Sequence, residues 1–324
     1  MTVNVKEKDI AEVKLPYKLI PFMKYRFIGY AFSLLITAFC IFTIATKGFN
    51  WGLDFTGGTV IETTFSQPAD LEKVRVSLEK EGYGSALVQT TGSLKDLMIR
   101  LPASAGDKDL GNKIINMVHR DLDQNATIKS VEFVGPNVGE ELTQGAIYAT
   151  LATLAMLLLY VGSRFEIRLA VGGVLALFHD VIVTLGVFSY LQIEVDLTFV
   201  AAILSVVGYS LNDSIVVFDR VRENFSKIRR VSSKEVIDIS LSQTLSRTLM
   251  TSITTLFVVA ALYWFGGPTI HSFSLALLIG IGFGTYSSIY IAIGVALELG
   301  LTREHMNKPV VEKEGANTDS FIDY

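Results

Sequence analysis

Long apolar runs alternate with polar stretches along the chain, and this pattern predicts a membrane protein. A helix needs roughly 20 apolar residues to cross the hydrocarbon core of a bilayer. Six stretches are long enough, and each is predicted to be a transmembrane helix: about 28–46, 142–162, 168–189, 197–218, 248–265 and 274–298. The first is not expected to be a cleaved signal peptide, because about 27 residues precede it and no small-x-small cleavage pattern follows it.

Basic residues flank these stretches on one side only, which predicts the direction in which the chain crosses the membrane. Lys and Arg stand before the first span, between the second and third, between the fourth and fifth, and after the sixth. The connections "QIEVD" and "FGGPTIHSF" have none. Both termini are therefore expected in the cytoplasm. Three cytoplasmic segments follow: an N-terminal arm (1–27), a loop (219–247) and a C-terminal tail (299–324).

Residues 47–141 join the first two spans and are then expected on the periplasmic side. The segment is too polar to span a membrane and long enough to form a domain. Its stretches, from "GTVIETTF" to "TIKSVEFVG", follow in the order strand, helix, strand, strand, helix, strand. That order favours a ferredoxin-like sandwich. The predicted fold class is a polytopic α-helical membrane protein with six transmembrane helices, five of them bundled over 142–298. One exported α+β domain (βαββαβ) lies between helices 1 and 2.

Composition excludes several classes of protein. The 324 residues carry a net charge of −4, too balanced for a nucleic-acid-binding protein, and the single cysteine allows neither an internal disulfide nor a multi-cysteine metal site. The Gly57-Gly58 pair in "WGLDFTGGTV" fits no nucleotide-binding motif, and a turn into the first strand is expected there. No cofactor is expected. Polar residues in the spans form no nucleophile, base and orienting set, so the chain is not expected to be an enzyme.

The fourth span contains an acidic residue, Asp213, within an apolar run. A carboxylate at the centre of a membrane helix costs at least about 2.5 kcal/mol. Asp213 should therefore face the interior of the bundle and either pair with a cation or stay protonated. Other small or polar residues share its helical spacings of three and four: Ser205, Gly208, Tyr209 and Asn212. The opposite positions are apolar and suit lipid or apolar neighbours: Ile203, Val207, Leu211 and Ile215.

The fifth span offers a cation, Arg247. Because neighbouring helices run in opposite directions, Asp213 and Arg247 both fall in the cytoplasmic half of the membrane, where a contact is geometrically reasonable. A helix movement that makes and breaks this pair would switch the proton affinity of the acid. Two interpretations stay open: proton or ion coupling, and a structural pair in which Asp213 fixes the helix register while Arg247 snorkels to the membrane face.

Further polar residues in the spans also have two interpretations. His179 and Asp180, near the middle of the third span, are either a second proton-relay site or, as we favour, a hydrogen-bonded pair that packs two helices. Thr251 begins a cluster of hydroxyl residues over 251–255, which could line a proton path or bond back to helix carbonyls. In the sixth span, small residues repeat every four positions and predict close helix packing: Gly280, Gly284 and Ser288.

Several stretches together resemble the SecF proteins of the SecD/SecF family of bacterial protein-export membrane proteins. They are "KGFNWGLDFTGGTVIE", "VEFVGPNVGEEL", "HDVIVTLG", "GYSLNDSIVVFDRVRENF" and "LSRTLMTSITTLFV". The resemblance runs from about residue 47 to "REHM" at 303–306 and includes the layout of six spans and the position of the exported domain. The first 27 residues and the tail after about 308 carry little of it.

The resemblance implies an auxiliary subunit of the Sec protein translocase in the bacterial inner membrane. The implied partners are SecD, the SecYEG translocon, YajC and the unfolded exported polypeptide. It also implies that the proton gradient drives export, with the family's intramembrane acid at Asp213 and its fifth-span arginine at Arg247. SecD and SecF together resemble the resistance-nodulation-division (RND) transporters. Two alternatives therefore remain: a proton-coupled small-molecule exporter of the RND type, and a passive scaffold for translocon assembly.

Overall fold

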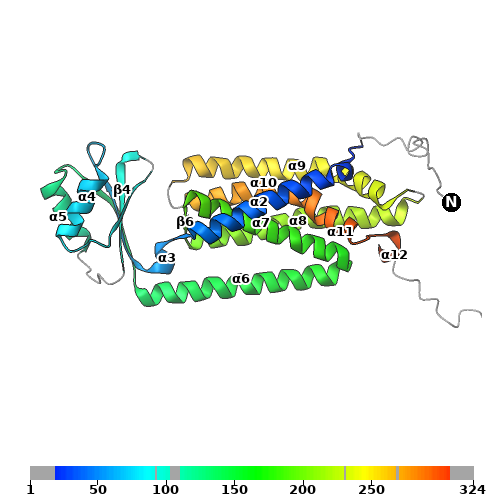
Figure 1. Cartoon of the computed structure of the whole chain (residues 1–324), viewed down its shortest axis with the longest axis horizontal. Coiled ribbons are helices and arrows are strands. Elements are labelled where there is room, and N and C mark those ends of the chain that lie inside the picture. The colour runs from blue at the N-terminus through cyan, green and yellow to red at the C-terminus, as the bar shows by residue number, and fades with distance from the viewer. Residues whose placement is uncertain (1–18, 92, 103–109, 230, 268–269, 307–324) are drawn as a thin grey trace, which may run out of the picture.

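The computed structural model describes residues 19–91, 93–102, 110–229, 231–267 and 270–306. Most of the predicted N-terminal arm and most of the predicted C-terminal tail lie outside these residues. The described chain forms a bundle of long helices with a smaller domain, made of a sheet and two helices, at one end (Figure 1). We call this smaller domain the sheet domain.

Six helices in the described chain are long and apolar enough to cross a membrane, and each contains one of the six predicted spans. The prediction of a polytopic helical protein is therefore confirmed. The sixth span is interrupted by one turn of π-helix, η4. The helices of the bundle are α2 (Arg26–Lys47), α6 (Pro136–Arg164), α7 (Ile167–Leu191), α8 (Leu197–Lys227), α9 (Ser233–Phe265), α10 (His271–Ser287), η4 (Ser288–Ala292) and α11 (Ile293–Glu298). The short helices η1 (Phe22–Lys24) and α12 (Arg303–Met306) flank them.

The predicted loop over 219–247 is wrong, because α8 continues to Lys227 and α9 already begins at Ser233. A capping box between Ser232 and Glu235 starts α9, with each side chain bonded to the other's backbone N–H. Both extensions bury apolar side chains, including Val221 and Phe225 of α8 and Val236 and Ile237 of α9. Hydropathy marks where a helix leaves the membrane, whereas caps and packing decide where the helix ends.

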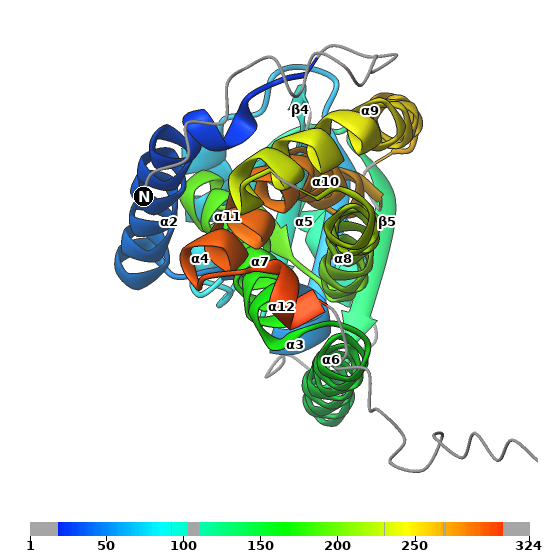
Figure 2. The same cartoon turned by 90° about the vertical axis from the view of Figure 1, so that its right-hand side faces the viewer.

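α7 and α10 lie at the centre of the bundle, and α6 lies at its edge. In α7 and in the last span, more than half of the residues in the most apolar stretch are buried. In α6, only 6% of the residues in the corresponding stretch are buried. Figure 2, seen along the bundle, shows α6 set apart from the other helices. Close approach of α10 to α8 depends on Gly280, where a Cβ would overlap the side chain of Val206. This contact accounts for the small residues predicted to pack there.

The sheet domain contains the predicted elements in the predicted order. Four strands form a sheet in the order β3-β4-β2-β5, and every neighbouring pair is antiparallel. The apolar core combines residues of the sheet and of both helices, such as Ile61, Leu78, Ile99 and Ile114. The elements are β2 (Gly58–Thr64), α4 (Leu71–Lys80), β3 (Leu87–Thr91), β4 (Ser93–Leu101), α5 (Leu110–Asp121) and β5 (Thr127–Val134).

A short junction connects the sheet domain to the bundle. The segment expected to be a simple turn contains a strand, β1 (Asn50–Trp51), and a one-turn helix, α3 (Leu53–Thr56). β1 pairs in parallel with β6 (Glu194–Val195), which directly precedes α8. The connection before the fourth span therefore lies against the connection after the first.

Candidate functional site in the helix bundle

Asp213 is buried in α8, with 2% of its surface exposed. Its Oδ2 atom has no hydrogen-bond partner among the described residues. The same is true of three buried hydroxyl groups on α8 and α9: those of Tyr209, Ser214 and Thr248. Buried polar atoms without partners are costly and rare in proteins. Half of the eight such side-chain atoms in the described chain thus belong to α8 and α9, the two helices that carry Asp213 and Arg247.

Arg247 is exposed on α9 and forms no ion pair with Asp213 in this structure. It lines an open pocket of about 390 Å³ between α8 and α9, together with Asn212, Asp219 and Glu223. The direct pair considered from the sequence is therefore absent from this structure.

The polar residues of α8 do not share one face. Asn212, Ser205 and Gly208 are exposed, whereas Asp213 is buried together with Ser210. Consecutive residues of an α-helix point about 100° apart, so Asn212 and Asp213 cannot face the same way. The structure thus places the acid inside and the amide outside. The apolar positions opposite, such as Val207 and Leu211, are buried against other helices.

Tyr209 and Thr251 differ in their surroundings. The ring of Tyr209 is half-buried, and its hydroxyl group is buried without a partner in the described chain. Thr251 is exposed and donates from Oγ1 to the backbone oxygen of Arg247, at 3.1 Å. Its hydroxyl group therefore bonds back to its own helix, which was one of the two interpretations considered for it.

Asp180 joins three helices through buried hydrogen bonds. Its Oδ2 accepts from Ser210 of α8 at 2.6 Å and from Ser287 of α10 at 2.7 Å. Its Oδ1 lies 3.0 Å from Nδ1 of His179, whose Nε2 is buried without a partner in the described chain. Asp180 is 1% exposed. This geometry fits the packing interpretation of the pair, and Ser287 immediately precedes the π-helical turn η4.

An ion pair that sequence reasoning missed ties the sheet domain to the bundle. Arg100 on β4 lies 2.7 Å from Glu194 on β6, and it also donates to the backbone oxygen of Trp51 at 2.7 Å. Nearby, the carboxylate of Asp54 accepts from the backbone N–H of Leu197, the first residue of α8, at 2.9 Å. Burial raises the pKa of Glu194, and the charge of Arg100 opposes that shift.

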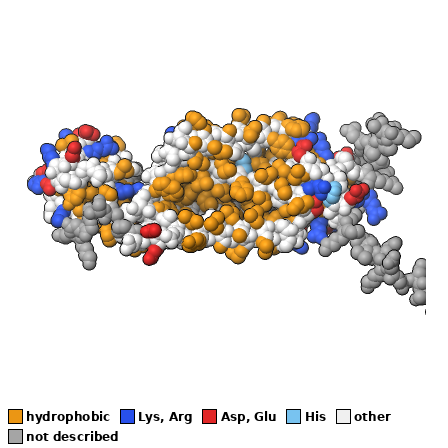
Figure 3. Space-filling view, turned by 60° about the horizontal axis from the view of Figure 1, so that its bottom comes forward, with side chains coloured by type: hydrophobic (Ala, Val, Ile, Leu, Met, Phe, Trp, Pro, Cys, Tyr) orange, Lys and Arg blue, Asp and Glu red, His pale blue; other side chains and the backbone are white. Residues whose placement is uncertain are grey.

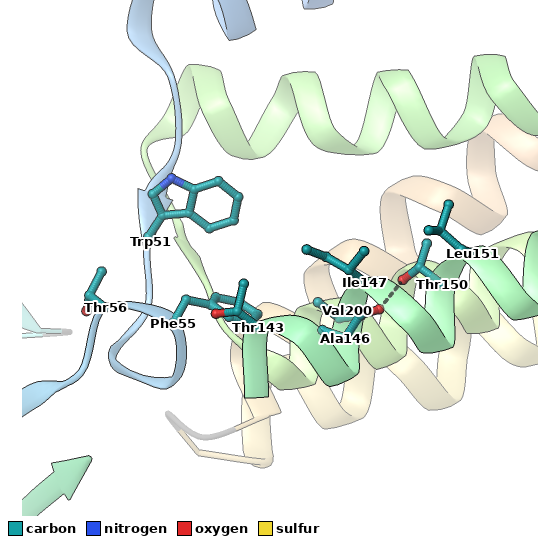
Figure 4. A pocket seen from close by; sticks show the side chains of 9 residues that line it. All are labelled: Trp51, Phe55, Thr56, Thr143, Ala146, Ile147, Thr150, Leu151 and Val200. Atoms are coloured by element: carbon teal, nitrogen blue, oxygen red, sulfur yellow. Dashed lines mark hydrogen bonds between the residues drawn. The ribbon is translucent and has the colours of Figure 1, made fainter. Parts of the chain in front are cut away.

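A second pocket, of about 490 Å³, opens where α3 and α6 meet α8 (Figure 4). Its walls are mostly apolar, with Phe55, Ile147 and Val200 among them, and Thr150 bonds to the backbone oxygen of Ala146. No charged side chain lines it. It is therefore separate from the acid on α8. Within the residues described here, no group of three or more His, Cys, Asp or Glu is arranged to hold a metal ion.

Two family models match the chain. Residues 114–302 match "Protein export membrane protein SecD/SecF, C-terminal", and residues 42–69 match the "SecD/SecF GG Motif". The chain belongs to the SecD/SecF family. The larger SecD/SecF match includes Asp180, Asp213 and Arg247. The GG-motif match covers the junction between α2 and the sheet domain.

Relatives named "Protein translocase subunit SecF" resemble the chain over nearly its whole length. The protein from Haemophilus influenzae is 64% identical over 95% of this chain and 94% of the relative. The protein from Vibrio alginolyticus is 55% identical over 94% of this chain and 97% of its own. The protein from Escherichia coli O157:H7 is 49% identical over 98% of this chain and 99% of its own.

Solved structures of SecDF share the fold. The crystal structure of SecDF from Thermus thermophilus, described as a translocon-associated membrane protein, superposes with a TM-score of 0.79 at 36% identity. The match covers 90% of this chain and 40% of that one. A structure of SecDF in its super-membrane-facing form superposes with a TM-score of 0.64 over the same shares.

Proposed function

We propose that the chain is an auxiliary subunit of the Sec protein translocase, acting with SecD and using the proton gradient to promote export of unfolded polypeptides across the inner membrane. Its SecD/SecF family and its SecF-named relatives support a role in protein export. The observation that carries the proton coupling is the buried Oδ2 of Asp213, which has no partner in the described chain although it lies within a membrane-spanning helix. A carboxyl group in that setting binds or releases a proton as its surroundings change.

SecD is the proposed membrane partner. The chain accounts for 40% of the SecDF chain that it resembles, which leaves the remainder for a SecD portion. Polar groups on the outer faces of α8 and α9 are exposed in spans that would otherwise face hydrocarbon: Ser205, Asn212, Arg247 and Thr251. Exposure of such groups to lipid is costly, so helices of a second subunit are expected to cover them. SecYEG and YajC are proposed as further partners.

The proposed orientation has both termini in the cytoplasm and residues 47–141 in the periplasm. Lys and Arg gather at the end of the bundle opposite the sheet domain (Figure 3). Excess positive charge marks the cytoplasmic side of a membrane protein. The strand order β3-β4-β2-β5, with all pairs antiparallel, supports a ferredoxin-like fold for the exported domain. We propose that this domain handles the emerging polypeptide.

We propose that the contacts at the junction transmit a change in the protonation of Asp213 to the sheet domain as a movement of α8. One charge that crosses 100 mV releases about 2.3 kcal/mol, which is enough to shift a two-state bundle substantially. α8, which carries Asp213, begins beside β6 and is bonded there to Asp54. Because β6 also pairs with β1 and with Arg100, a shift of α8 would reach the sheet domain directly.

Export in proteoliposomes that contain SecD and SecYEG tests the proposal. Asp213→Asn should abolish gradient-dependent export while the complex still assembles. Asp219→Asn is the matched control, because this carboxylate lies on the same helix but lines the open pocket. Loss of proton flux without loss of export would favour a small-molecule exporter. If Asp213→Asn changed neither export nor proton flux, proton coupling through Asp213 would be refuted. A passive role in translocon assembly would then be the remaining function.

A further inference from the structure

A basic pocket lies at the end of the bundle opposite the sheet domain. It has a volume of about 380 Å³ and is formed by the turn between α6 and α7, by the extension of α8 and by α12. Arg164, Arg222 and His305 line it. None of these residues belongs to the proposed proton site.

One arginine of this pocket has no partner in the described chain, and the other has only a long and exposed one. Arg222 is half-buried and has no hydrogen-bond or ion-pair partner for its guanidinium among the described residues. Arg164 lies over the ring of Phe165 and forms an ion pair with Asp219 at 3.5 Å, a separation too long for a strong hydrogen bond. A half-buried guanidinium normally has an anionic or carbonyl partner. The pocket therefore has unused capacity for an anion.

The one acidic residue in the pocket does not cancel this capacity. Glu166 caps the N-terminus of α7, and its Oε2 accepts from the backbone N–H of Arg168 at 2.8 Å. Its Oε1 accepts from the guanidinium of Arg168 at 2.6 Å. The charge of Glu166 is thus balanced by Arg168. The positive charge of Arg222 remains for a ligand, and Arg164, whose ion pair with Asp219 is long and exposed, can turn to the same ligand.

The position of the pocket indicates that this ligand is a lipid. The pocket begins at Ser163, directly after the apolar part of α6 ends, which is where the hydrocarbon layer of a bilayer gives way to headgroups. An apolar pocket of about 300 Å³ lies between the same helices, α6 and α7, and reaches Leu158. Leu158 is five residues from Ser163, or about 7.5 Å along a helix. A lipid whose headgroup binds the arginines would therefore place its acyl chains beside the apolar pocket between α6 and α7.

We propose that the pocket binds the phosphate headgroup of an anionic phospholipid through Arg164 and Arg222, with the acyl chains along α6 and α7. Arginine matches a phosphate in charge and in bidentate geometry. Basic pockets between membrane helices on the cytoplasmic side are a known form of lipid site. The bound lipid would hold the α6–α7 turn, the extension of α8 and α12 together at the membrane surface.

Native mass spectrometry of the full-length protein tests this site, with titration by phosphatidylglycerol, phosphatidylethanolamine and inorganic phosphate. Phosphatidylglycerol should bind at least about tenfold more tightly than phosphatidylethanolamine. Arg222→Gln and Arg164→Gln should each weaken phosphatidylglycerol binding about tenfold. Arg220→Gln is the matched control on the same helix, because Arg220 already pairs with Glu223 at 2.9 Å. It should leave the affinity unchanged.

Four results would overturn the proposal. Equal affinity of both lipids, or equal affinity of all three variants, would exclude a headgroup site. Displacement of phosphatidylglycerol by inorganic phosphate at equal concentration would identify a site for free anions. Residues 307–324 contain several acidic residues. If a chain ending at Met306 bound phosphatidylglycerol much more tightly than the full-length chain, the acidic segment 307–324, and not a lipid, would be the ligand of the pocket.

Discussion

The guanidinium group of Arg100 lies 2.7 Å from the carboxylate of Glu194, and this ion pair joins the sheet domain to the helix bundle. The two side chains are only 14% and 27% exposed, so water screens them little. Glu194 stands three residues before Leu197, where α8 begins. The pair is therefore placed to transmit a displacement of α8 to the strand that carries Arg100.

Reversing one charge of this pair should loosen the junction. Arg100→Glu or Glu194→Arg is expected to cost about 1–3 kcal/mol of local stability, because a partly buried charge loses its partner. The double variant should recover part of that loss. Hydrogen exchange of the amide of Gly52, which donates to Val195 at 2.8 Å, reports the change.

The pair of Arg120 and Glu81 is the control for this experiment. It lies on the same domain but is 60% and 41% exposed, so its charge reversal should leave exchange at the junction unchanged. Equal effects of both reversals would mean that Arg100 and Glu194 have no special role in holding the domain.

Removal of the Asp180 carboxyl group should destabilise the bundle. In Asp180→Ala, the hydroxyl group of Ser210 loses its acceptor and that of Ser287 keeps only the backbone oxygen of Gly284, at a cost on the order of 3 kcal/mol. Asp180→Asn keeps an oxygen that accepts both bonds and should cost clearly less. Thermal unfolding in detergent compares the two variants. Identical melting temperatures would show that the hydroxyl bonds to Asp180 contribute nothing.

Gly280 should not tolerate even one added methyl group. A Cβ there would overlap Val206 of α8, and overpacking of this kind costs about 1–3 kcal/mol. Gly282→Ala is the matched control, because a Cβ at Gly282 meets no atom within 4 Å and lies on the same helix. Gly280→Ala should lower the melting temperature relative to Gly282→Ala. A reversed order would contradict the close packing of α8 and α10.

The stability of the sheet domain should fall in acid. Hydrogen bonds from Lys129 and Thr64 hold the pKa of Asp96 below its usual range. The folded state therefore favours the ionised form. Asp96 contributes stability that is present above its unfolded pKa of about 3.9 and is lost as the pH falls through the lower folded value.

Hydrogen exchange of β2, β4 and β5, corrected for intrinsic rates, measures this loss between about pH 6 and pH 3. Protection should decrease with acid in the unmodified protein and decrease less in Asp96→Asn, which has no charge to lose. The same dependence in both proteins would exclude Asp96 as a source of acid sensitivity.

The six spans, the order of elements in the sheet domain and the presence of an acid, Asp213, inside the fourth span could all be read from the sequence. These features are local or compositional: a helix in hydrocarbon needs a long apolar run, strands and helices differ in period, and an acid in such a run is costly. The same reasoning misjudged the segment 219–247, because an amphipathic helix can continue beyond the membrane after hydropathy has fallen.

The polar groups that meet across helices and domains could not be read from the sequence. Asp180 bonds to serines 30 and 107 residues away, and Arg100 pairs with a glutamate on a strand that belongs to the connection before the fourth span. The separation of Asn212 from Asp213 likewise depends on which helices pack against α8. Contacts of this kind depend on the packing of whole helices and domains, so no spacing within one segment of the chain reveals them.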